Sequence, residues 1–385
     1  YIYAAEAALS RSIRMKIGVP KEIKNHEYRV GMVPASVKEL TRRNHEVLVQ
    51  AGAGVGIGFS DEDYIVVGET IAATADEVFA EADMIVKVKE PLTAERAKLR
   101  SGQVLFTYLH LAPDPEQTKD LVNSDAICIA YETVTSNSGM LPLLAPMSEV
   151  AGRMSIQAGA HSLEKAQGGR GVLLAGVPGV APAKVVILGG GVVGSNAAQM
   201  AIGMGAQVTI LDNNINSLRR LDAQFGASAQ LVYSTGESLK EYVQAADLVI
   251  GAVLVPGAAA PKLVTKKMIA NMKPGAVVVD VAIDQGGCFE TSKATTHQDP
   301  TYMVGDVVHY CVANMPGGVA RTSSFALNNA TLPYIIALAE KGWKQACADD
   351  VHLLNGLNVH RGQVTNEPVA VNLGYEFVNP ATLVG

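Results

Sequence analysis

The stretch Lys184-Val185-Val186-Ile187-Leu188-Gly189-Gly190-Gly191-Val192-Val193-Gly194-Ser195-Asn196-Ala197-Ala198 decides the fold. An apolar, β-branched run is followed by glycines and then by small helix-forming residues, which predicts a strand, a tight turn and a helix. Gly189, Gly191 and Gly194 match the pattern G-x-G-x-x-G. The first glycine permits the turn, the second lets a pyrophosphate approach the backbone, and the third lets the helix pack on the strand.

An acidic residue follows this turn at a suitable distance. A second predicted strand, residues 207–211, ends in Asp212, 23 residues after Gly189. A carboxylate there can accept hydrogen bonds from an adenosine ribose and repels a 2′-phosphate, which favours NAD over NADP. Because the chain contains 37 glycines, a glycine-rich turn without a ligand remains the alternative.

Length and composition limit the other possibilities. A chain of 385 residues is expected to form two domains, and 48% hydrophobic with 18% charged residues is typical of a globular protein. A net charge of −6 gives no basic surface for nucleic acid. The sequence contains no apolar run of the roughly 18–20 residues that a membrane span needs.

The four cysteines lie far apart, with no C-x-x-C pair. They are expected to be core thiols in a reducing compartment, with a disulfide or metal set as the alternative. The sequence shows no cluster of residues that indicates a metal site.

Strands and helices alternate through the first third of the chain. Strands are predicted at 16–19, 46–50, 84–89, 104–110 and 126–132, with helices at 33–43, 76–82 and 115–123. This alternation predicts βαβ units and a largely parallel sheet. Ligands bind beyond the carboxyl ends of such strands, so Lys89 and His110, at two predicted strand ends, are candidates for one crevice.

The remaining segments complete a two-domain plan. A helix at 142–167 leads into the nucleotide half, which has further strands at 231–233, 248–253, 276–281 and 303–305, and a helix at 319–350 returns the chain. We therefore expect an α/β protein of two Rossmann-like doubly wound domains. Residues 15–141 and 320–385 form the substrate domain, which the C-terminal segment completes, and residues 142–319 form the nucleotide domain. Residues 1–14 read as an added leader before Met15.

Four polar side chains could carry chemistry, and each has an alternative interpretation. Arg29 could clamp a carboxylate, or it could be a solvated loop arginine. Lys89 and Lys87 share a face of their predicted strand and could be ligands, or they could protect a sheet edge. His110 could transfer protons, or it could be a core histidine. Asp284 could face a nicotinamide, or it could cap a turn.

Longer phrases resemble the L-alanine dehydrogenase family. They are residues 87–91 (KVKEP), 142–153 (PLLAPMSEVAGR), 251–257 (GAVLVPG), 284–290 (DQGGCFE) and 311–316 (CVANMP). The resemblance covers essentially all of residues 15–385. It implies reversible oxidative deamination of L-alanine to pyruvate and ammonium with NAD as hydride acceptor, in a cytoplasmic homohexamer.

The resemblance also assigns roles to individual residues. Arg29 and Lys89 correspond to the substrate-binding residues, and His110 and Asp284 to the catalytic pair. The implied dinucleotide contacts, besides the three glycines, are Ser148, Val192, Val193, Asp212, Ser234, Val253, Leu254, Val281, Ala282, Ile283, Val312, Ala313, Asn314 and Met315. Ser217 is a departure, because family members often have a lysine or arginine there, and its absence could loosen the adenosine end.

Three other functions are compatible with the sequence. The NAD-binding subunit of a proton-translocating transhydrogenase has a similar fold, and a saccharopine-type dehydrogenase is a further relative. A catalytically silent NAD-binding regulator is the alternative from a different class. The sequence of residues 284–289 and the presence of all four polar groups favour the alanine dehydrogenase interpretation.

Overall fold

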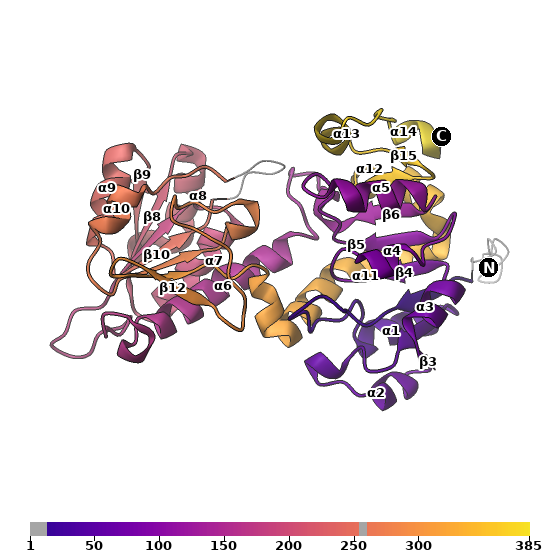
Figure 1. Cartoon of the computed structure of the whole chain (residues 1–385), viewed down its shortest axis with the longest axis horizontal. Coiled ribbons are helices and arrows are strands. Elements are labelled where there is room, and N and C mark those ends of the chain that lie inside the picture. Colours follow the sequence, from indigo (N-terminus) through magenta and orange to yellow (C-terminus); the bar gives the residue numbers. More distant parts are fainter. Residues whose placement is uncertain (1–13, 254–259) are drawn as a thin grey trace, which may run out of the picture. The chain divides into compact units, whose positions relative to one another are not determined.

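The computed structural model describes residues 14–253 and 260–385. The chain divides into two compact units (Figure 1): unit 1 comprises the chain up to Pro146 together with Val319–Gly385, and unit 2 comprises Met147–Gly318. All but the last residue of the expected leader lies outside the described residues. In the described part of the chain, no helix has the length and apolar character needed to span a membrane.

Unit 1 is built on an eight-stranded sheet with the order β15-β14-β6-β5-β4-β1-β2-β3. Its six parallel strands are β1 (Lys16–Val19), β2 (Glu46–Gln50), β3 (Thr70–Ala72), β4 (Met84–Val86), β5 (Val104–Thr107) and β6 (Ile127–Ala130). The strands β4, β5 and β6 are buried along their whole length, as expected for parallel strands with both faces covered. From the C-terminal segment, β14 (Leu357–His360) pairs antiparallel with β6, and β15 (Gln363–Val364) with β14.

Helices connect the strands of unit 1. They are α1 (Pro34–Thr41), α2 (Asp61–Ile65), α3 (Ala75–Glu81), α4 (Thr93–Arg96), α5 (Pro115–Asn123), α11 (Ala320–Asp349), α12 (Val351–Leu354), α13 (Glu367–Leu373) and α14 (Ala381–Val384), with 3₁₀ turns η1 (Val55–Ile57) and η2 (Tyr131–Thr133). Local sequence sets several helix starts: Asp114 accepts a hydrogen bond from the Gln117 N–H, and Pro115 occupies the first turn of α5.

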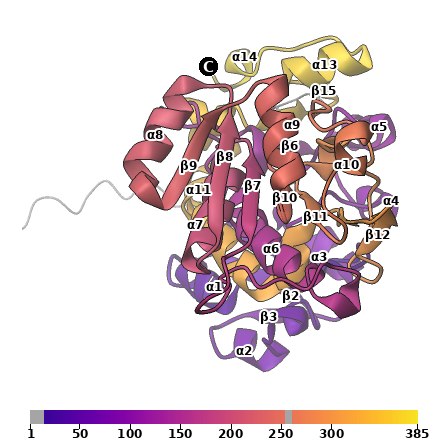
Figure 2. The ribbon, with the colours of Figure 1, turned by 90° about the vertical axis from the view of Figure 1, so that its left-hand side faces the viewer.

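Unit 2 has a seven-stranded sheet with the order β12-β13-β11-β10-β7-β8-β9, and Figure 2 shows β9, β8, β7 and β10 side by side. The strands are β7 (Lys184–Leu188), β8 (Gln207–Asp212), β9 (Ala229–Tyr233), β10 (Leu248–Gly251), β11 (Val277–Asp280), β12 (Thr301–Val304) and β13 (Val307–Tyr310), all parallel except β12. The helices are α6 (Ala145–Ser162), α7 (Val192–Gly203), α8 (Ile215–Phe225), α9 (Gly236–Ala245) and α10 (Lys266–Ala270), with 3₁₀ turns η3 (Lys165–Gln167), η4 (Gly226–Ser228), η5 (Ile283–Gln285) and η6 (Met315–Val319).

The core of unit 2 lies on both faces of its sheet. Val185 and Ile187 belong to one buried apolar cluster, while Val186 and Leu188 belong to another. Alternate side chains of β7 therefore enter opposite cores, which explains why this strand reads as a continuous apolar run.

Both sheets have the doubly wound order 3-2-1-4-5-6 in their parallel strands, so the expected fold class is confirmed. The switch point of each sheet is the place where the strand order reverses. It lies between β1 and β4 in unit 1 and between β7 and β10 in unit 2. Four short strands, β3, β13, β14 and β15, were missed by the sequence prediction. The predicted helix 319–350 is α11, which contains Pro333 and is interrupted by a non-helical Gly342 with φ of 72°.

Candidate active site

Three of the four predicted polar residues lie at one edge of the unit 1 sheet. Arg29 follows β1, Lys89 follows β4 and His110 follows β5, and these three strands are consecutive in the sheet. Because parallel strands present their carboxyl ends at the same edge, the structure brings the three residues to the switch point. The strands end earlier than predicted, at Val86 and Thr107, so Lys89 and His110 lie on the turns that follow.

Arg29 is buried, so its interpretation as a solvated loop arginine is wrong. Glu27 holds the guanidinium: its Oε1 accepts from Nε at 2.7 Å and its Oε2 from Nη2 at 2.6 Å. Burial alone lowers the pKa of Arg29, but the Glu27 carboxylate outweighs burial and raises the pKa above its ordinary value. The result is a fixed positive charge beside the switch point.

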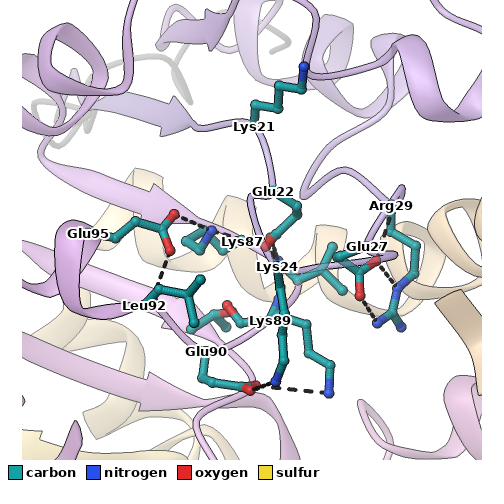
Figure 3. A network of polar contacts seen from close by, with 12 residues as sticks. Lys21, Glu22, Lys24, Glu27, Arg29, Lys87, Lys89, Glu90, Leu92 and Glu95 are labelled. Carbon is teal, nitrogen blue, oxygen red and sulfur yellow. Dashed lines mark hydrogen bonds and ion pairs between the residues drawn. The ribbon is translucent and has the colours of Figure 1, made fainter. Parts of the chain in front are cut away.

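Lys87 and Lys89 have different environments. Lys87 is completely buried, and its Nζ lies 3.0 Å from Glu22 Oε2 and 2.6 Å from Glu95 Oε1 (Figure 3). Edge protection is therefore wrong for this segment, because β4 lies between β1 and β5. The lysine pair was predicted to share one face, but the strand ends before either residue.

Lys89 lies beside a carboxylate that it shares with another lysine. Its Nζ is 3.9 Å from Glu90 Oε2, and Lys24 forms an ion pair with the other oxygen of Glu90. Burial alone would raise the pKa of Glu90, but the ammonium groups of Lys89 and Lys24 outweigh it and hold the pKa below its ordinary value. Figure 3 shows Lys89, Glu90 and Lys24 together below Glu22.

His110 is exposed, so the core interpretation of this histidine is wrong. Its side chain is 45% exposed, its ring stacks on that of Tyr108 at 5.8 Å, and its φ of 51° lies in the left-handed region. A non-glycine residue in that conformation needs support, which Glu132 provides by accepting hydrogen bonds from the backbone N–H groups of Leu109 and His110.

The glycine-rich turn of unit 2 has the conformation that its pattern predicts. Gly189 has φ of 97°, and a Cβ on Gly194 would lie 1.8 Å from the Gly189 carbonyl oxygen, so only glycine fits there. A Cβ on Gly191 would meet no atom of the described residues within 4 Å. Gly191 precedes α7, whose first N–H groups can bind an anion. The open space at Gly191 therefore fits a pyrophosphate, and the residues present fit a dinucleotide.

Asp212 ends β8 beside this turn. Its Oδ2 accepts from the Gly190 N–H and its Oδ1 from the Asn214 N–H, both at 2.7 Å. A carboxylate has about four acceptor sites, so these bonds leave capacity for a ribose hydroxyl. Ser217 lies in the first turn of α8, and the same helix brings Arg220 to the Gly190 carbonyl at 2.6 Å. The sequence did not predict this cation beside the turn.

The other expected dinucleotide residues follow neighbouring strands. Ser234 comes after β9, Val253 after β10, residues 281–283 after β11 and residues 312–315 after β13, which places them at the same sheet edge as Gly189. Ser148 lies in the first turns of α6. Leu254 lies outside the described residues.

Asp284 is exposed on η5, after β11. The turn is supported by a second aspartate, Asp280, which was not predicted from the sequence. Asp280 is completely buried and accepts hydrogen bonds from the N–H groups of Ala282 and Cys288. Burial raises the pKa of Asp280, although its hydrogen bonds partly oppose this. The placement of Asp284 leaves both of its interpretations open.

All four cysteines are buried and free, so they are core thiols as expected. Within residues 14–253 and 260–385, the structure shows no group of three or more His, Cys, Asp or Glu side chains that could hold a metal ion.

The architecture defines the class of the molecule: a two-domain α/β protein that combines a Rossmann-type dinucleotide fold with a second doubly wound domain. Family models agree with this class. Residues 18–151 match the N-terminal domain of alanine dehydrogenase/PNT, and residues 155–367 match its C-terminal domain. The chain belongs to the alanine dehydrogenase/PNT family.

Individual relatives are similar over nearly the whole chain. The chain is 61% identical to an alanine dehydrogenase of Halomonas elongata, covering 96% of this chain and 100% of that protein. It is 55% identical to the alanine dehydrogenase of Mycobacterium tuberculosis, covering 96% and 100%. A solved L-alanine dehydrogenase superposes with a TM-score of 0.91 at 51% identity, covering 94% and 99%. A transhydrogenase from Sinorhizobium meliloti is less similar, with a TM-score of 0.80 at 26% identity, covering 91% and 100%.

Proposed function

We propose that this protein is an NAD-dependent alanine dehydrogenase, which converts L-alanine reversibly to pyruvate and ammonium. The observation that carries the proposal is the convergence of Arg29, Lys89 and His110 at the switch point of the unit 1 sheet. The names of relatives that are 55–61% identical over nearly their full length support the same activity.

The substrate side is formed by two cations. Arg29 provides a positive charge for the alanine carboxylate, and Glu27 fixes its orientation through two hydrogen bonds. Lys89 helps Arg29 to bind the substrate, and it polarises the carbonyl oxygen that develops as pyruvate forms, which stabilises charge where the reaction creates it.

Proton transfer is assigned to His110 and Asp284. The exposed imidazole of His110 exchanges a proton with the amino group or with the carbinolamine that water addition produces. Loss of the hydride from the alanine Cα leaves an iminium, and Asp284 orients and deprotonates the water that attacks it; the carbinolamine then expels ammonia, which leaves as ammonium, to give pyruvate. Bound NAD supplies the acceptor for the hydride that leaves the alanine Cα.

The nucleotide side is assigned to the edge of the unit 2 sheet. Gly189, Gly191 and Gly194 with the start of α7 hold the pyrophosphate, and Asp212 holds the ribose and disfavours a 2′-phosphate. The open space beside Gly191 supports this assignment.

A spectrophotometric assay of NADH formation tests the activity. We expect NADH formation with L-alanine, and little with glycine, L-serine or buffer alone. His110→Ala and Asp284→Asn should each lower kcat by about 10²–10⁴-fold while NADH binding is retained. Arg29→Lys keeps the charge but loses the planar fork, so the KM for alanine should rise. A transhydrogenase subunit or a silent regulator would bind NADH yet form none from alanine, and that result would refute the proposal.

We also infer a cytoplasmic homohexamer, which is supported by the resemblance to the family. Light scattering on the eluted protein tests the assembly, with six times the chain mass of 40.4 kDa expected. A monomer or dimer at assay concentration would contradict it. Fractionation of the source cells tests the location.

A further inference from the structure

The segment Lys87–Lys89 is held at every backbone polar group. Its three carbonyl oxygens accept from Tyr131 Oη at 3.0 Å, the Tyr108 N–H at 3.3 Å and Thr107 Oγ1 at 3.0 Å. The Lys87 N–H donates to the Phe106 carbonyl at 3.2 Å. The two remaining N–H groups, of Val88 and Lys89, both donate to Glu22 Oε1, at 2.7 and 3.3 Å. This turn is therefore fixed although it lies beyond the end of β4.

Glu22 is a buried carboxylate with no part in the proposed chemistry. While its Oε1 binds the two N–H groups, its Oε2 binds the ammonium of Lys87 at 3.0 Å. Burial raises the pKa of Glu22, and the charge of Lys87 opposes that rise. Burial likewise lowers the pKa of Lys87, but Glu22 and Glu95 outweigh it and raise the pKa above its ordinary value. Lys87 thus stays charged, and its charge favours the ionised form of Glu22.

Resting on the proposed function, we infer that Glu22 is a positioning residue for Lys89. The ammonium of Lys89 stands on a flexible four-carbon stem, and its nearest carboxylate, Glu90, is 3.9 Å away and is also paired with Lys24. The backbone therefore decides where the ammonium can reach, and Glu22 fixes that backbone. A displacement of about 1 Å in such a group can cost about 10²-fold in rate.

Glu95 provides a matched control for Glu22. The two side chains are 3% and 2% exposed, and both bind the Lys87 ammonium. Glu95 Oε2 accepts from the Leu92 N–H at 2.9 Å, at the start of α4, whereas Glu22 accepts from Val88 and Lys89. Removing either charge leaves Lys87 with one carboxylate, but only the Glu22 variant alters the acceptor of the Lys89 N–H.

The test compares Glu22→Gln with Glu95→Gln in the full chain. Both variants should lower Tm by a similar amount. Glu22→Gln should raise the KM for L-alanine about tenfold, whereas Glu95→Gln should change it no more than about twofold. The KM for NAD should not change in either variant. An equal rise of the alanine KM in both variants, or no rise in Glu22→Gln, would overturn the inference.

A double-mutant cycle with Lys89→Met separates this inference from the proposed function. We expect Lys89→Met to raise the alanine KM, and Glu22→Gln to add no further rise in that background. If Lys89→Met leaves the KM unchanged, the proposed substrate role of Lys89 fails. If Lys89→Met raises the KM and Glu22→Gln adds a full independent rise, only the positioning role fails.

A second variant covers the case in which Glu22→Gln does not fold. Glu22→Asp keeps the charge beside Lys87 but withdraws the carboxylate by one methylene. We expect a smaller loss of Tm and still a raised alanine KM. An unchanged KM in Glu22→Asp would overturn the inference.

Discussion

One oxygen of Glu132 contacts both the backbone and the ring of His110. Oε1 accepts the His110 N–H at 2.6 Å and lies 3.9 Å from Nδ1 of the imidazole. Because His110 has a left-handed φ of 51°, this carboxylate supports a conformation that the chain would not otherwise prefer.

Glu132→Gln should lower kcat at least tenfold, because an amide replaces an acceptor-only group and weakens the hold on the turn. Steady-state kinetics at saturating alanine measure the effect. Glu116→Gln, on the exposed side of α5, is the control and should leave kcat unchanged. If the Glu132 variant turns over at the normal rate, the support is not needed for catalysis.

Asp212→Asn should relax the discrimination against NADP. The amide removes the negative charge that faces the 2′ position yet keeps one oxygen for the Gly190 N–H. We expect kcat/KM with NADP, relative to NAD, to rise about tenfold or more. Asp222→Asn removes the same charge from the exposed face of α8 and should leave the ratio unchanged. A wild-type protein that already uses both cofactors equally would disprove this role.

The pattern of apolar residues predicted the two sheets because a buried parallel strand must be apolar on both faces. The short strand β13 was missed because the turn at Gly305 and Asp306 read as the end of the unit 2 sheet, whereas it joins β12 to β13 in a hairpin. The strands β4 and β5 were predicted too long. The residues that follow them are mostly apolar or lysine, and this pattern is the same whether or not those residues continue the hydrogen-bonded ladder of the sheet.

The residue pattern singled out the four polar site residues and the family resemblance assigned their roles, but their supports could not be predicted. Glu22, Glu27 and Glu132 are glutamates in turns, which are most often solvated. The partners of Glu22 and Glu132 lie far away in sequence: the Val88 N–H that Glu22 binds is 66 residues further along the chain, and the His110 N–H that Glu132 binds is 22 residues before it. The one available signal was Lys87, because a lysine after a wholly apolar strand needs a buried counter-charge.

Gly191→Ala and Gly194→Ala should separate ligand binding from folding. The methyl group at Gly194 would collide with the Gly189 carbonyl, so the free energy of unfolding should fall by about 3 kcal/mol. At Gly191 the methyl group meets nothing within 4 Å in the part of the chain that the structure describes, and φ is −69°, so Tm should hardly change. The affinity for NADH should nevertheless fall about tenfold, because the methyl group occupies the space expected for the pyrophosphate.

Thermal unfolding and a fluorescence titration with NADH provide the two measurements. Each variant is the control for the other, since both add one methyl group to the same turn. If Gly191→Ala binds NADH as tightly as the wild type, the pyrophosphate does not approach the backbone there.

Glu69 gives the protein a pH-dependent stability that is independent of the site. Both of its carboxylate oxygens are buried and, among the described residues, have no hydrogen-bond partner. Burial raises the pKa of Glu69 to about 8. In the unfolded chain the pKa is about 4.3, so between these two values the folded state binds more protons than the unfolded state. The free energy of unfolding must therefore fall as the pH rises through this window and level off above about pH 8.

Glu69→Gln, which cannot ionise, should remove this part of the pH dependence. The variant should match the wild type near pH 5 and exceed its free energy of unfolding by up to about 4 kcal/mol near pH 9. Urea unfolding at several pH values measures the difference. Glu62→Gln, on the exposed face of α2, is the control, and its difference from the wild type should stay constant across the window. A constant difference for Glu69→Gln as well would mean that the Glu69 carboxyl is ionised throughout and that the structure supplies a partner for its charge.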